Sequence, residues 1–190
     1  EMTSSLVGSE MCIRDREQAL YYARSIHLER DYSVRKLSLE QVVKSAVKKH
    51  AKQLIACNIR LQFDNLEKTI YSDSKWLDFI LGQLISNSIK YRSDNPALLF
   101  SAEENKDSVL LHVEDNGIGI ADNDINRIFD KGFTGQNGRN FTKSTGLGLY
   151  LCRQLCNKMH LNIYASSEVR SGTTITIVFP KDSLTLLQEE

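Results

Sequence analysis

The sequence has little of several features that would indicate a partner or a compartment. Its 24 basic and 24 acidic side chains cancel, so no excess charge recruits nucleic acid or an anionic membrane surface. No apolar run approaches the roughly 20 residues that a membrane-spanning helix needs, and the first residues lack the pattern of a secretory signal. The four cysteines form no paired framework, which suits a reducing cytoplasm. These absences predict a cytoplasmic domain without a nucleic-acid partner and without a membrane contact of its own.

What is present suffices for one domain with a sizeable core and short appendages. Residues 1–16 lack sustained periodicity and are rich in small polar residues, so we interpret them as a foreign or disordered extension. Residues 17–31 place apolar side chains at helical steps and are typical of the end of a helix. The sequence predicts a folded domain over residues 32–182 and a C-terminal tail over residues 183–190.

The apolar pattern mixes helices and strands without the strict alternation of a parallel doubly wound sheet. Helices are expected over residues 38–56, with Ser38 as N-cap and Gln41 in the capping-box position, over 74–91, briefly over 122–130, and over 145–159. Strands are expected over residues 59–64 and 68–72, paired as a hairpin, over 108–115, and over 161–168 and 172–180, joined by a turn at Ser171 and Gly172. The sequence therefore predicts an α+β fold in two layers, a sheet covered on one face by about three helices.

Cys152, Cys156 and His160 recur at every fourth residue, a spacing that would place them on one face of a helix. Cysteines that alternate with leucines are also ordinary components of a hydrophobic core, and no fourth ligand is evident. We therefore favour packing over a metal site.

A stretch with two glycines, VEDNGIGI, follows directly from a predicted strand. No lysine follows these glycines or those of TGLGL, and neither stretch has the spacing of a dinucleotide fingerprint, which excludes a P-loop and a dinucleotide-binding loop. Gly117 and Gly119 have no side chains and let a flat ligand lie against the backbone. Asp115, at the end of the strand, offers a buried acceptor that suits an exocyclic amine.

The turn Thr145–Gly148 begins a helix whose free N–H groups and positive dipole end favour phosphate. On the predicted helix 74–91, Asn87 offers a neutral oxygen for a hard cation and Lys90 a positive charge for phosphate oxygens. Each feature alone has a simpler explanation, since DNG is a good turn, Asn87 can satisfy a backbone group and Lys90 can be a solvated surface lysine. These simpler explanations apply to each feature alone, but they do not account for the combination of the features in this order.

Four stretches in order, LISNSIKY, VEDNGIGI, IFDKGFTG and TGLGLYL, resemble the N, G1, F and G2 boxes of the histidine-kinase ATP-binding domain. The superfamily of this domain includes DNA gyrase, the MutL repair proteins and the heat-shock chaperone ATPases. The resemblance covers residues 37–180. The stretches KGFTGQNGRNFTKSTGLGLYLC and EQALYYARS are similar to bacitracin-type, membrane-embedded sensor kinases of Gram-positive bacteria.

The resemblance implies a left-handed βαβ ATP fold with a mixed, mainly antiparallel sheet, and MgATP as its ligand. It implies that Asp115 binds the adenine amino group, that Asn87 ligates Mg²⁺, and that Lys90 and Tyr91 contact phosphate or sugar. Asn87 and Lys90 are the implied catalytic positions. Gly117 and Gly119 would make room for the ring, while Gly146 and Gly148 would hinge and close the phosphate end. The ligand-contacting positions that it implies are Asn87, Lys90, Tyr91, Asp115, Gly117, Gly119, Ile120, Phe133, Lys143, Thr145, Gly146, Leu147 and Gly148.

The same resemblance implies a lid over residues 136–144 that becomes ordered with nucleotide. Phe129 and Phe133 would support this lid. Arg139 and Lys143 would reach phosphate from it, although lid residues in a polar loop are equally compatible with a solvated role.

Two departures from the superfamily decide between chemistries. The related hydrolases and serine kinases carry a glutamate one turn before the metal asparagine as general base, whereas this chain has Gln83 there, and an amide cannot accept the proton. A histidine acceptor has less need of a base, because it presents a free lone pair near neutral pH. The sequence therefore favours phosphoryl transfer to histidine over hydrolysis.

The second departure is that no histidine of this chain is followed by Glu or Asp, the pattern of the phosphoacceptor in this family. The resemblance therefore implies a catalytic fragment whose acceptor lies in an upstream helical hairpin, with residues 17–31 as the end of its second helix. It also implies a downstream response regulator as partner, and a parent protein in the bacterial cell membrane. The alternatives are a nucleotide-gated interaction module of the same fold without transfer, and a structural domain that binds no nucleotide.

Overall fold

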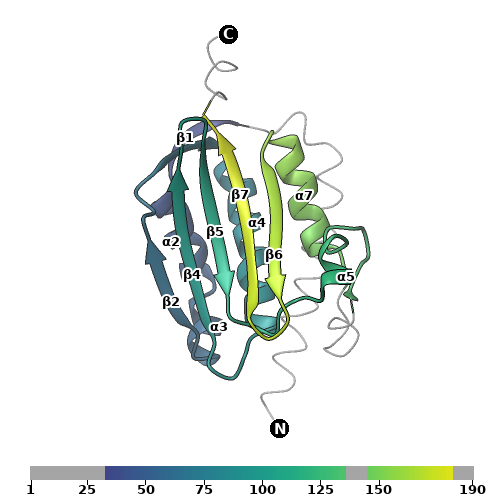
Figure 1. Cartoon of the computed structure of the whole chain (residues 1–190). Coiled ribbons are helices and arrows are strands. Elements are labelled where there is room, and N and C mark those ends of the chain that lie inside the picture. The colour runs from purple at the N-terminus through teal and green to yellow at the C-terminus, as the bar shows by residue number, and fades with distance from the viewer. Residues whose placement is uncertain (1–32, 136–144, 182–190) are drawn as a thin grey trace.

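The computed structural model describes residues 33–135 and 145–181, which form two layers (Figure 1). The main sheet has five strands in the order β2-β4-β5-β7-β6, and a separate pair joins β1 to β3. The strands are β1 (Arg35–Ser38), β2 (Arg60–Asp64), β3 (Thr69–Ser72), β4 (Ala97–Glu104), β5 (Ser108–Asp115), β6 (Asn162–Glu168) and β7 (Gly172–Pro180). The helices are α2 (Leu39–Lys49), α3 (Ala51–Ala56), α4 (Ser74–Lys90), α5 (Asp122–Ile125) and α7 (Gly148–Lys158).

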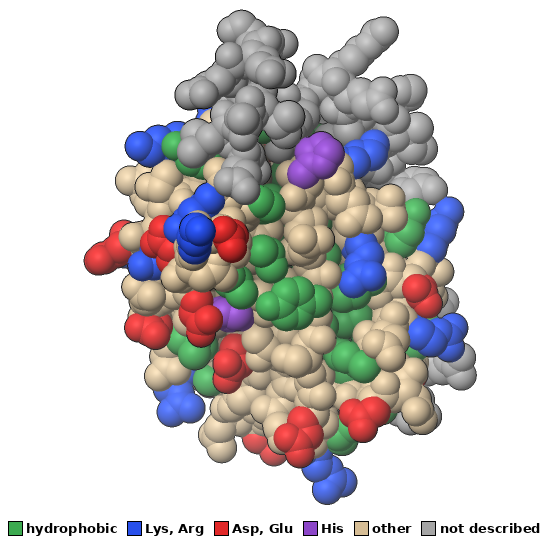
Figure 2. All heavy atoms as spheres, turned by 45° about the horizontal axis from the view of Figure 1, so that its top comes forward, with side chains coloured by type: hydrophobic (Ala, Val, Ile, Leu, Met, Phe, Trp, Pro, Cys, Tyr) green, Lys and Arg blue, Asp and Glu red, His purple; other side chains and the backbone are tan. Residues whose placement is uncertain are grey.

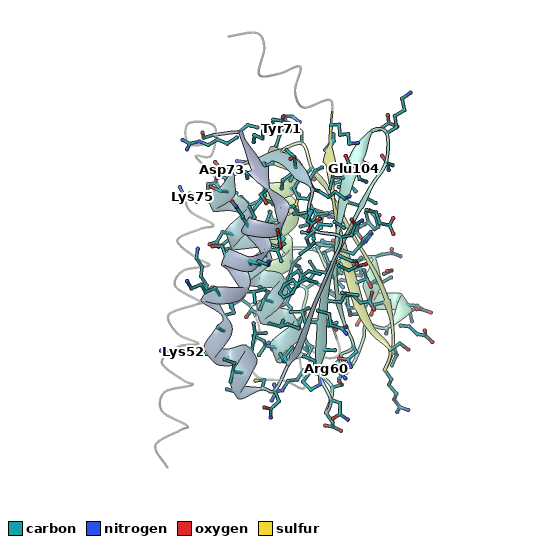
Figure 3. The ribbon with its side chains drawn as sticks, turned by 90° about the vertical axis from the view of Figure 1, so that its left-hand side faces the viewer. Lys52, Arg60, Tyr71, Asp73, Lys75 and Glu104 are labelled. Carbon is teal, nitrogen blue, oxygen red and sulfur yellow. The ribbon has the colours of Figure 1, made fainter. Side chains whose placement is uncertain are left out.

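The edge-on view in Figure 3 shows a layer of helices on one side and the strands of the main sheet as a second layer on the other. Strands β2 and β4 pair in parallel, and the pairs β4–β5, β5–β7 and β6–β7 are antiparallel. The α+β fold with a mixed, mainly antiparallel sheet covered on one face by helices is therefore confirmed.

Alternate residues of the strands point into the core, as the period of a half-buried strand requires. Leu98, Phe100 and Leu111 are fully buried there. Helix α4 presents Trp76 and Ile80 to the same core, and it is the most deeply buried helix that the structure describes. Figure 2 shows the other face of the sheet, where acidic and basic side chains are mixed around apolar ones and no single charge dominates.

The predicted hairpin of residues 59–64 and 68–72 is wrong. Strand β2 pairs in parallel with β4, and β3 pairs antiparallel with β1. The connection between them does not make a tight turn, because Leu66 is buried and the Asn65 amide donates to the Ala102 carbonyl 2.8 Å away, which fastens it to β4. The sequence analysis also missed β1 and β4.

The bounds of three helices differ from the predicted ones, and one of these helices, α7, begins at Gly148 instead of Thr145. The helix predicted over residues 38–56 divides at His50, whose backbone N–H caps α2 by donating to the Val47 carbonyl. The helix predicted over residues 122–130 ends at Ile125, and turns follow.

Other local predictions are confirmed. The Ser38 hydroxyl accepts from the Gln41 N–H at the start of α2, and α4 begins after Asp73 (labelled in Figure 3), which caps it. Strand β5 has the predicted bounds, and β6 and β7 are adjacent antiparallel strands. Among the residues described, no helix is long and apolar enough to cross a membrane.

Candidate functional site

Three parts of the fold meet where β5 ends: the C-terminal end of α4, the loop of residues 116–121, and the turn between β6 and β7 (lower end of Figure 1). We call residues 116–121 the glycine loop. The Ile118 N–H donates to the Tyr91 carbonyl at 3.0 Å, which ties the loop to the end of α4. The Ile118 carbonyl accepts from the Arg170 N–H at 2.9 Å, which ties the loop to the β6–β7 turn.

Asp115 is an acidic group that two hydrogen bonds hold at this place. Its Oδ1 accepts from the Gly117 N–H at 3.0 Å and its Oδ2 accepts from the Ser88 hydroxyl at 2.9 Å. Burial raises the pKa of the Asp115 carboxyl, while the Gly117 N–H, the Ser88 hydroxyl and the Thr173 N–H oppose this shift. A carboxylate that is partly buried and oriented by fixed donors is typical of functional sites.

Ser88 is a site residue that the sequence analysis missed. It lies on the buried side of α4, one turn after Leu84, and is 5% exposed. Its hydroxyl lies 3.2 Å from the Leu84 carbonyl and 2.9 Å from Asp115 Oδ2. The available signal was a serine at a core position of an otherwise apolar stripe, because a buried hydroxyl needs a partner.

We expect Asp115→Asn to leave the nucleotide-free domain as stable as the unmodified protein at pH 7, or more stable. The reason is that the folded-state pKa of Asp115 lies above its ordinary value, so the ionised carboxylate destabilises the fold at neutral pH. This destabilisation disappears as the pH falls through the raised pKa, and the difference between the proteins should therefore shrink toward about pH 4. Thermal unfolding of both proteins across this range tests the prediction.

The control is Asp122→Asn, since Asp122 is exposed on α5. A lower unfolding midpoint for Asp115→Asn at pH 7 would contradict the expectation, because it would show that the hydrogen bonds to the carboxylate outweigh the penalty of burying it.

The polar face of α4 has the predicted composition. Gln83, Asn87 and Lys90 follow one another at steps of four and three within one continuous helix, and each is partly buried. The Lys90 ammonium lies 5.2 Å from the centre of the Tyr91 ring. Because the Tyr91 carbonyl accepts from the Ile118 N–H, the C-terminal end of α4, which carries Lys90, lies next to the glycine loop.

The two glycines of the loop have packing reasons of their own. A Cβ on Gly117 would lie 2.3 Å from the Tyr91 carbonyl oxygen. Gly119 has φ +70°, and a Cβ there would lie 2.0 Å from the Glu168 carbonyl oxygen. Only glycine permits these backbone contacts, and the prediction that both glycines also make room for a ring stays a prediction.

The second glycine turn is joined to the segment that contains Phe133. The Gly132 N–H donates to the Gly146 carbonyl at 3.1 Å, so the two flanks of residues 136–144 meet. A Cβ on Gly146, which has φ +64°, would lie 2.4 Å from the Gly132 carbonyl carbon. Helix α7 begins at Gly148, three residues after the predicted start at Thr145, and Thr145 and Leu147 lie in the turn before it. The predicted lid, with Arg139 and Lys143, lies outside the described residues.

An arginine side chain lies over each of the two phenylalanine rings that are predicted to support the lid. The Arg127 guanidinium lies 4.6 Å from the Phe133 ring centre, and that of Arg153 lies 4.1 Å from the Phe129 ring centre. The Arg153 side chain also donates to the Ile163 carbonyl, which connects α7 to β6. An open hollow of about 250 Å³ lies on the segment from Arg127 to Gly135.

Cys152 and Cys156 lie in the core, whereas His160 is exposed. Burial raises the pKa of both thiols, that of Cys156 to about 12. Across residues 33–135 and 145–181, no group of three or more His, Cys, Asp or Glu side chains is placed to hold a metal ion.

Residues 72–183 match the family described as "Histidine kinase-, DNA gyrase B-, and HSP90-like ATPase". The chain is 34% identical over 167 residues to the sensor histidine kinase YxdK of Bacillus subtilis, with 86% of this chain and 51% of YxdK aligned. It is also 34% identical over 167 residues to the sensor protein BceS of Halalkalibacterium halodurans, covering 88% of this chain and 50% of BceS. The chain thus spans about half the length of these curated relatives.

Solved structures of similar fold are histidine kinases. The catalytic domain of histidine kinase ThkA superposes with a TM-score of 0.68 at 22% identity, covering 78% of this chain and 98% of that domain. The histidine kinase AdeS of Acinetobacter baumannii gives 0.73 at 22% identity, covering 94% of this chain and 83% of AdeS. ThkA in complex with the response regulator protein TrrA gives 0.71 at 17% identity, covering 93% of this chain and 49% of that one. At these identities the likeness establishes the fold.

Proposed function

Because the chain belongs to the family of histidine kinase-, DNA gyrase B- and HSP90-like ATPases, we propose that it is the ATP-binding catalytic domain of a two-component sensor histidine kinase. In this proposal it binds MgATP and donates the γ-phosphoryl group to a histidine on a separate helical hairpin. The sensor kinase relatives support this choice within the family.

The oriented carboxylate of Asp115 is the observation that carries the proposal. Its oxygens accept from the Gly117 N–H and the Ser88 hydroxyl, which fixes the plane of the group. An ionised carboxylate has about four acceptor positions, so capacity remains for the amino group of adenine. In a partly buried site such a charge-assisted bond discriminates well, because guanine presents a carbonyl where adenine presents an amine.

The polar face of α4 and the start of α7 suit the triphosphate and its metal ion. We propose that the Asn87 side-chain oxygen ligates Mg²⁺, because this ion prefers oxygen ligands, keeps several waters and uses few protein groups when phosphate is present. Lys90 and Tyr91 then contact phosphate or sugar. The turn Thr145–Gly148 offers its N–H groups to phosphate oxygens, with Leu147 between the two glycines. When bound, Mg²⁺ would neutralise developing charge on the phosphate oxygens.

The remaining predicted contacts belong to the same proposal. Ile120, at the end of the glycine loop, and Phe133, below the second glycine turn, would line the two ends of the nucleotide. Lys143 would reach phosphate from residues 136–144. Gln83 favours transfer over hydrolysis, since its amide cannot remove a proton from water, and the domain's contribution is to position MgATP and offset its charge.

The organisation of the chain follows from this function. We propose that residues 1–16 are an extension, that residues 17–31 end the dimerisation and phosphotransfer hairpin, that residues 32–182 are the catalytic domain, and that residues 183–190 are a tail. The partners are the hairpin of the parent kinase and a response regulator, as in the ThkA complex with TrrA. The parent would lie in the bacterial cell membrane with this domain in the cytoplasm.

The transfer step is tested by mixing the chain with a separately produced hairpin of a parent kinase and γ-labelled ATP. We expect label on the hairpin histidine, and we expect Asn87→Ala to reduce the transfer rate by about 100-fold, because a metal ion supplies several kcal/mol of charge stabilisation. Asn123→Ala, at an exposed asparagine of α5, is the matched control and should transfer normally.

One outcome would contradict the kinase assignment, and another would contradict the role of Asn87. Saturable binding of ATP without transfer to any supplied hairpin would favour a nucleotide-gated interaction module of the same fold. Equal transfer by Asn87→Ala and the unmodified chain would remove Asn87 from the metal site.

A further inference from the structure

The glycine loop contacts the end of the β6–β7 hairpin as well as α4. The Arg170 N–H donates to the Ile118 carbonyl at 2.9 Å, and Gly119 lies against the Glu168 backbone so closely that a Cβ would not fit. Gly172 lies equally close to the Asp115 carbonyl, where a Cβ would be 1.9 Å away. The loop is therefore held between a helix and a hairpin.

Ser167, near the end of β6, joins the hairpin to the far end of the loop. Its Oγ accepts from the Ile120 N–H at 2.9 Å and donates to the Gly172 carbonyl at 2.6 Å. It also lies 2.9 Å from the Thr173 hydroxyl oxygen. A serine hydroxyl has one proton, and here Gly172 receives it, so the Thr173 hydroxyl is the donor toward Ser167. One oxygen thus connects the loop, the turn and β7.

The same hairpin also reaches Asp115. Thr173 is the register partner of Asp115 across β5 and β7, and its backbone N–H is one of the groups that oppose the raised pKa of this carboxyl. The hydroxyl pair of Ser167 and Thr173 therefore links Ile120 to the strand residue that contacts Asp115. A displacement of the loop at Ile120 would therefore be transmitted toward the Asp115 carboxylate through the side chains of Ser167 and Thr173.

We propose that Ser167 is a positioning residue for nucleotide binding, which holds the glycine loop at its distance from Asp115 before ATP arrives. The inference rests on the proposed function, because it assigns to Ser167 a role in the ATP site. Ser167 acts through the backbone of Ile120. A preformed loop lowers the entropic cost of ATP binding, because the loop does not have to be ordered when the nucleotide binds.

The structure also explains why the effect should be local. Ser167 is half-buried, and the backbone pairing of β6 with β7 from Asn162 to Glu168 does not depend on its side chain. The hydrophobic core includes Ile163 and Ile175 of these strands but not Ser167. Loss of the hydroxyl removes its hydrogen bonds to the Ile120 N–H, the Gly172 carbonyl and the Thr173 hydroxyl, and only the first of these reaches the glycine loop. The loop itself therefore loses one hydrogen bond.

The test compares the unmodified chain, Ser167→Ala and the control Ser166→Ala, whose side chain is exposed on the neighbouring residue. Calorimetric titration with MgATP should show an affinity about five- to tenfold lower for Ser167→Ala and unchanged for Ser166→Ala. In the nucleotide-free protein, the Ile120 amide of Ser167→Ala should exchange with solvent at least about tenfold faster, while the β5 amides keep their rates. The Ser167→Cys variant keeps the shape of the side chain but forms weaker hydrogen bonds, so its ATP affinity should lie between those of Ser167→Ala and the unmodified chain. This variant tests the proposal if Ser167→Ala does not fold.

Unchanged ATP affinity in the serine variants would overturn the proposal, whatever the exchange rate of Ile120. A loss of affinity accompanied by faster exchange throughout the sheet would also overturn it, since Ser167 would then serve stability alone. Failure of the unmodified chain to bind ATP would instead refute the proposed function, and it would leave the exchange comparison as an independent measurement of the bond between Ser167 and the loop.

Discussion

Replacing Asp115 with alanine is expected to weaken ATP binding by one to two powers of ten. The carboxylate is partly buried and oriented by Ser88 and Gly117, and a hydrogen bond to such a charged group contributes about 1.5 to 3 kcal/mol. The same substitution should reduce discrimination against GTP, because the group that distinguishes an amine from a carbonyl is removed. Calorimetric titration of each protein with Mg²⁺ and either nucleotide measures both effects.

Glu114→Ala is the matched control for this experiment. Glu114 is the adjacent acidic residue of β5, but its side chain is exposed on the opposite face of the strand. It should bind ATP as the unmodified chain does. Equal affinities for Asp115→Ala and Glu114→Ala would mean that the carboxylate at the end of β5 does not recognise the base.

Replacing Gly119 with alanine is expected to lower the free energy of unfolding by about 3 kcal/mol and to abolish nucleotide binding. The substitution combines a left-handed backbone, φ +70°, with a Cβ that would lie 2.0 Å from the Glu168 carbonyl oxygen. Backbone strain and overpacking each contribute about 1 to 3 kcal/mol. For a domain of this size the thermal midpoint should fall by about 6 to 12 °C.

Gly132→Ala separates the strain from the overpacking, since Gly132 has a similar φ of +77°, but no atom of the described residues lies within 4 Å of an added Cβ. Only the strain of the left-handed backbone applies there, about 1 to 1.5 kcal/mol, so the midpoint should fall by about 2 to 6 °C. Thermal unfolding of both variants makes the comparison. If they lose equal stability, the contact between the glycine loop and the β6–β7 hairpin is not close in solution.

The parts of the fold with strong local signals were predictable from the sequence. Strand β5 has an apolar residue at every second position, Val109, Leu111 and Val113, and α4 carries a continuous apolar stripe from Trp76 to Leu84. The start of α7 is marked by its glycine turn. In each case one short stretch contains both the pattern and its boundary.

Long-range pairing could not be predicted in the same way. Residues 59–64 and 69–72 are close in sequence and alternate well, but their partners lie in β4 and β1. The choice is made by Leu66 entering the core and by Asn65 bonding to β4, and neither event has a local signature. Tertiary contacts therefore override the short-range expectation.

In the candidate site, too, some residues could be selected from the sequence and others could be recognised only from the fold. Asp115, Asn87 and Lys90 could be selected as candidates from the sequence because their residue types and spacing suit a nucleotide. Ser88 and Ser167 were missed because a serine becomes a positioning group only when the fold brings an acceptor or a donor to it, over 27 positions for Ser88 with Asp115 and 47 for Ser167 with Ile120. The close backbone contacts at Gly117 and Gly119 likewise become visible only once α4 and the hairpin are in place.

The central claim is that the glycine loop, Asp115 and the face of α4 form an ATP site, and one titration tests it most directly. The unmodified chain is titrated in a calorimeter with a non-hydrolysable ATP analogue and Mg²⁺, and then with the corresponding GTP analogue. We predict saturable binding of the ATP analogue at one site per chain and binding of the GTP analogue that is at least about tenfold weaker. Absence of binding by a sample that unfolds cooperatively on heating would contradict the account, and equal binding of both analogues would contradict the role of Asp115.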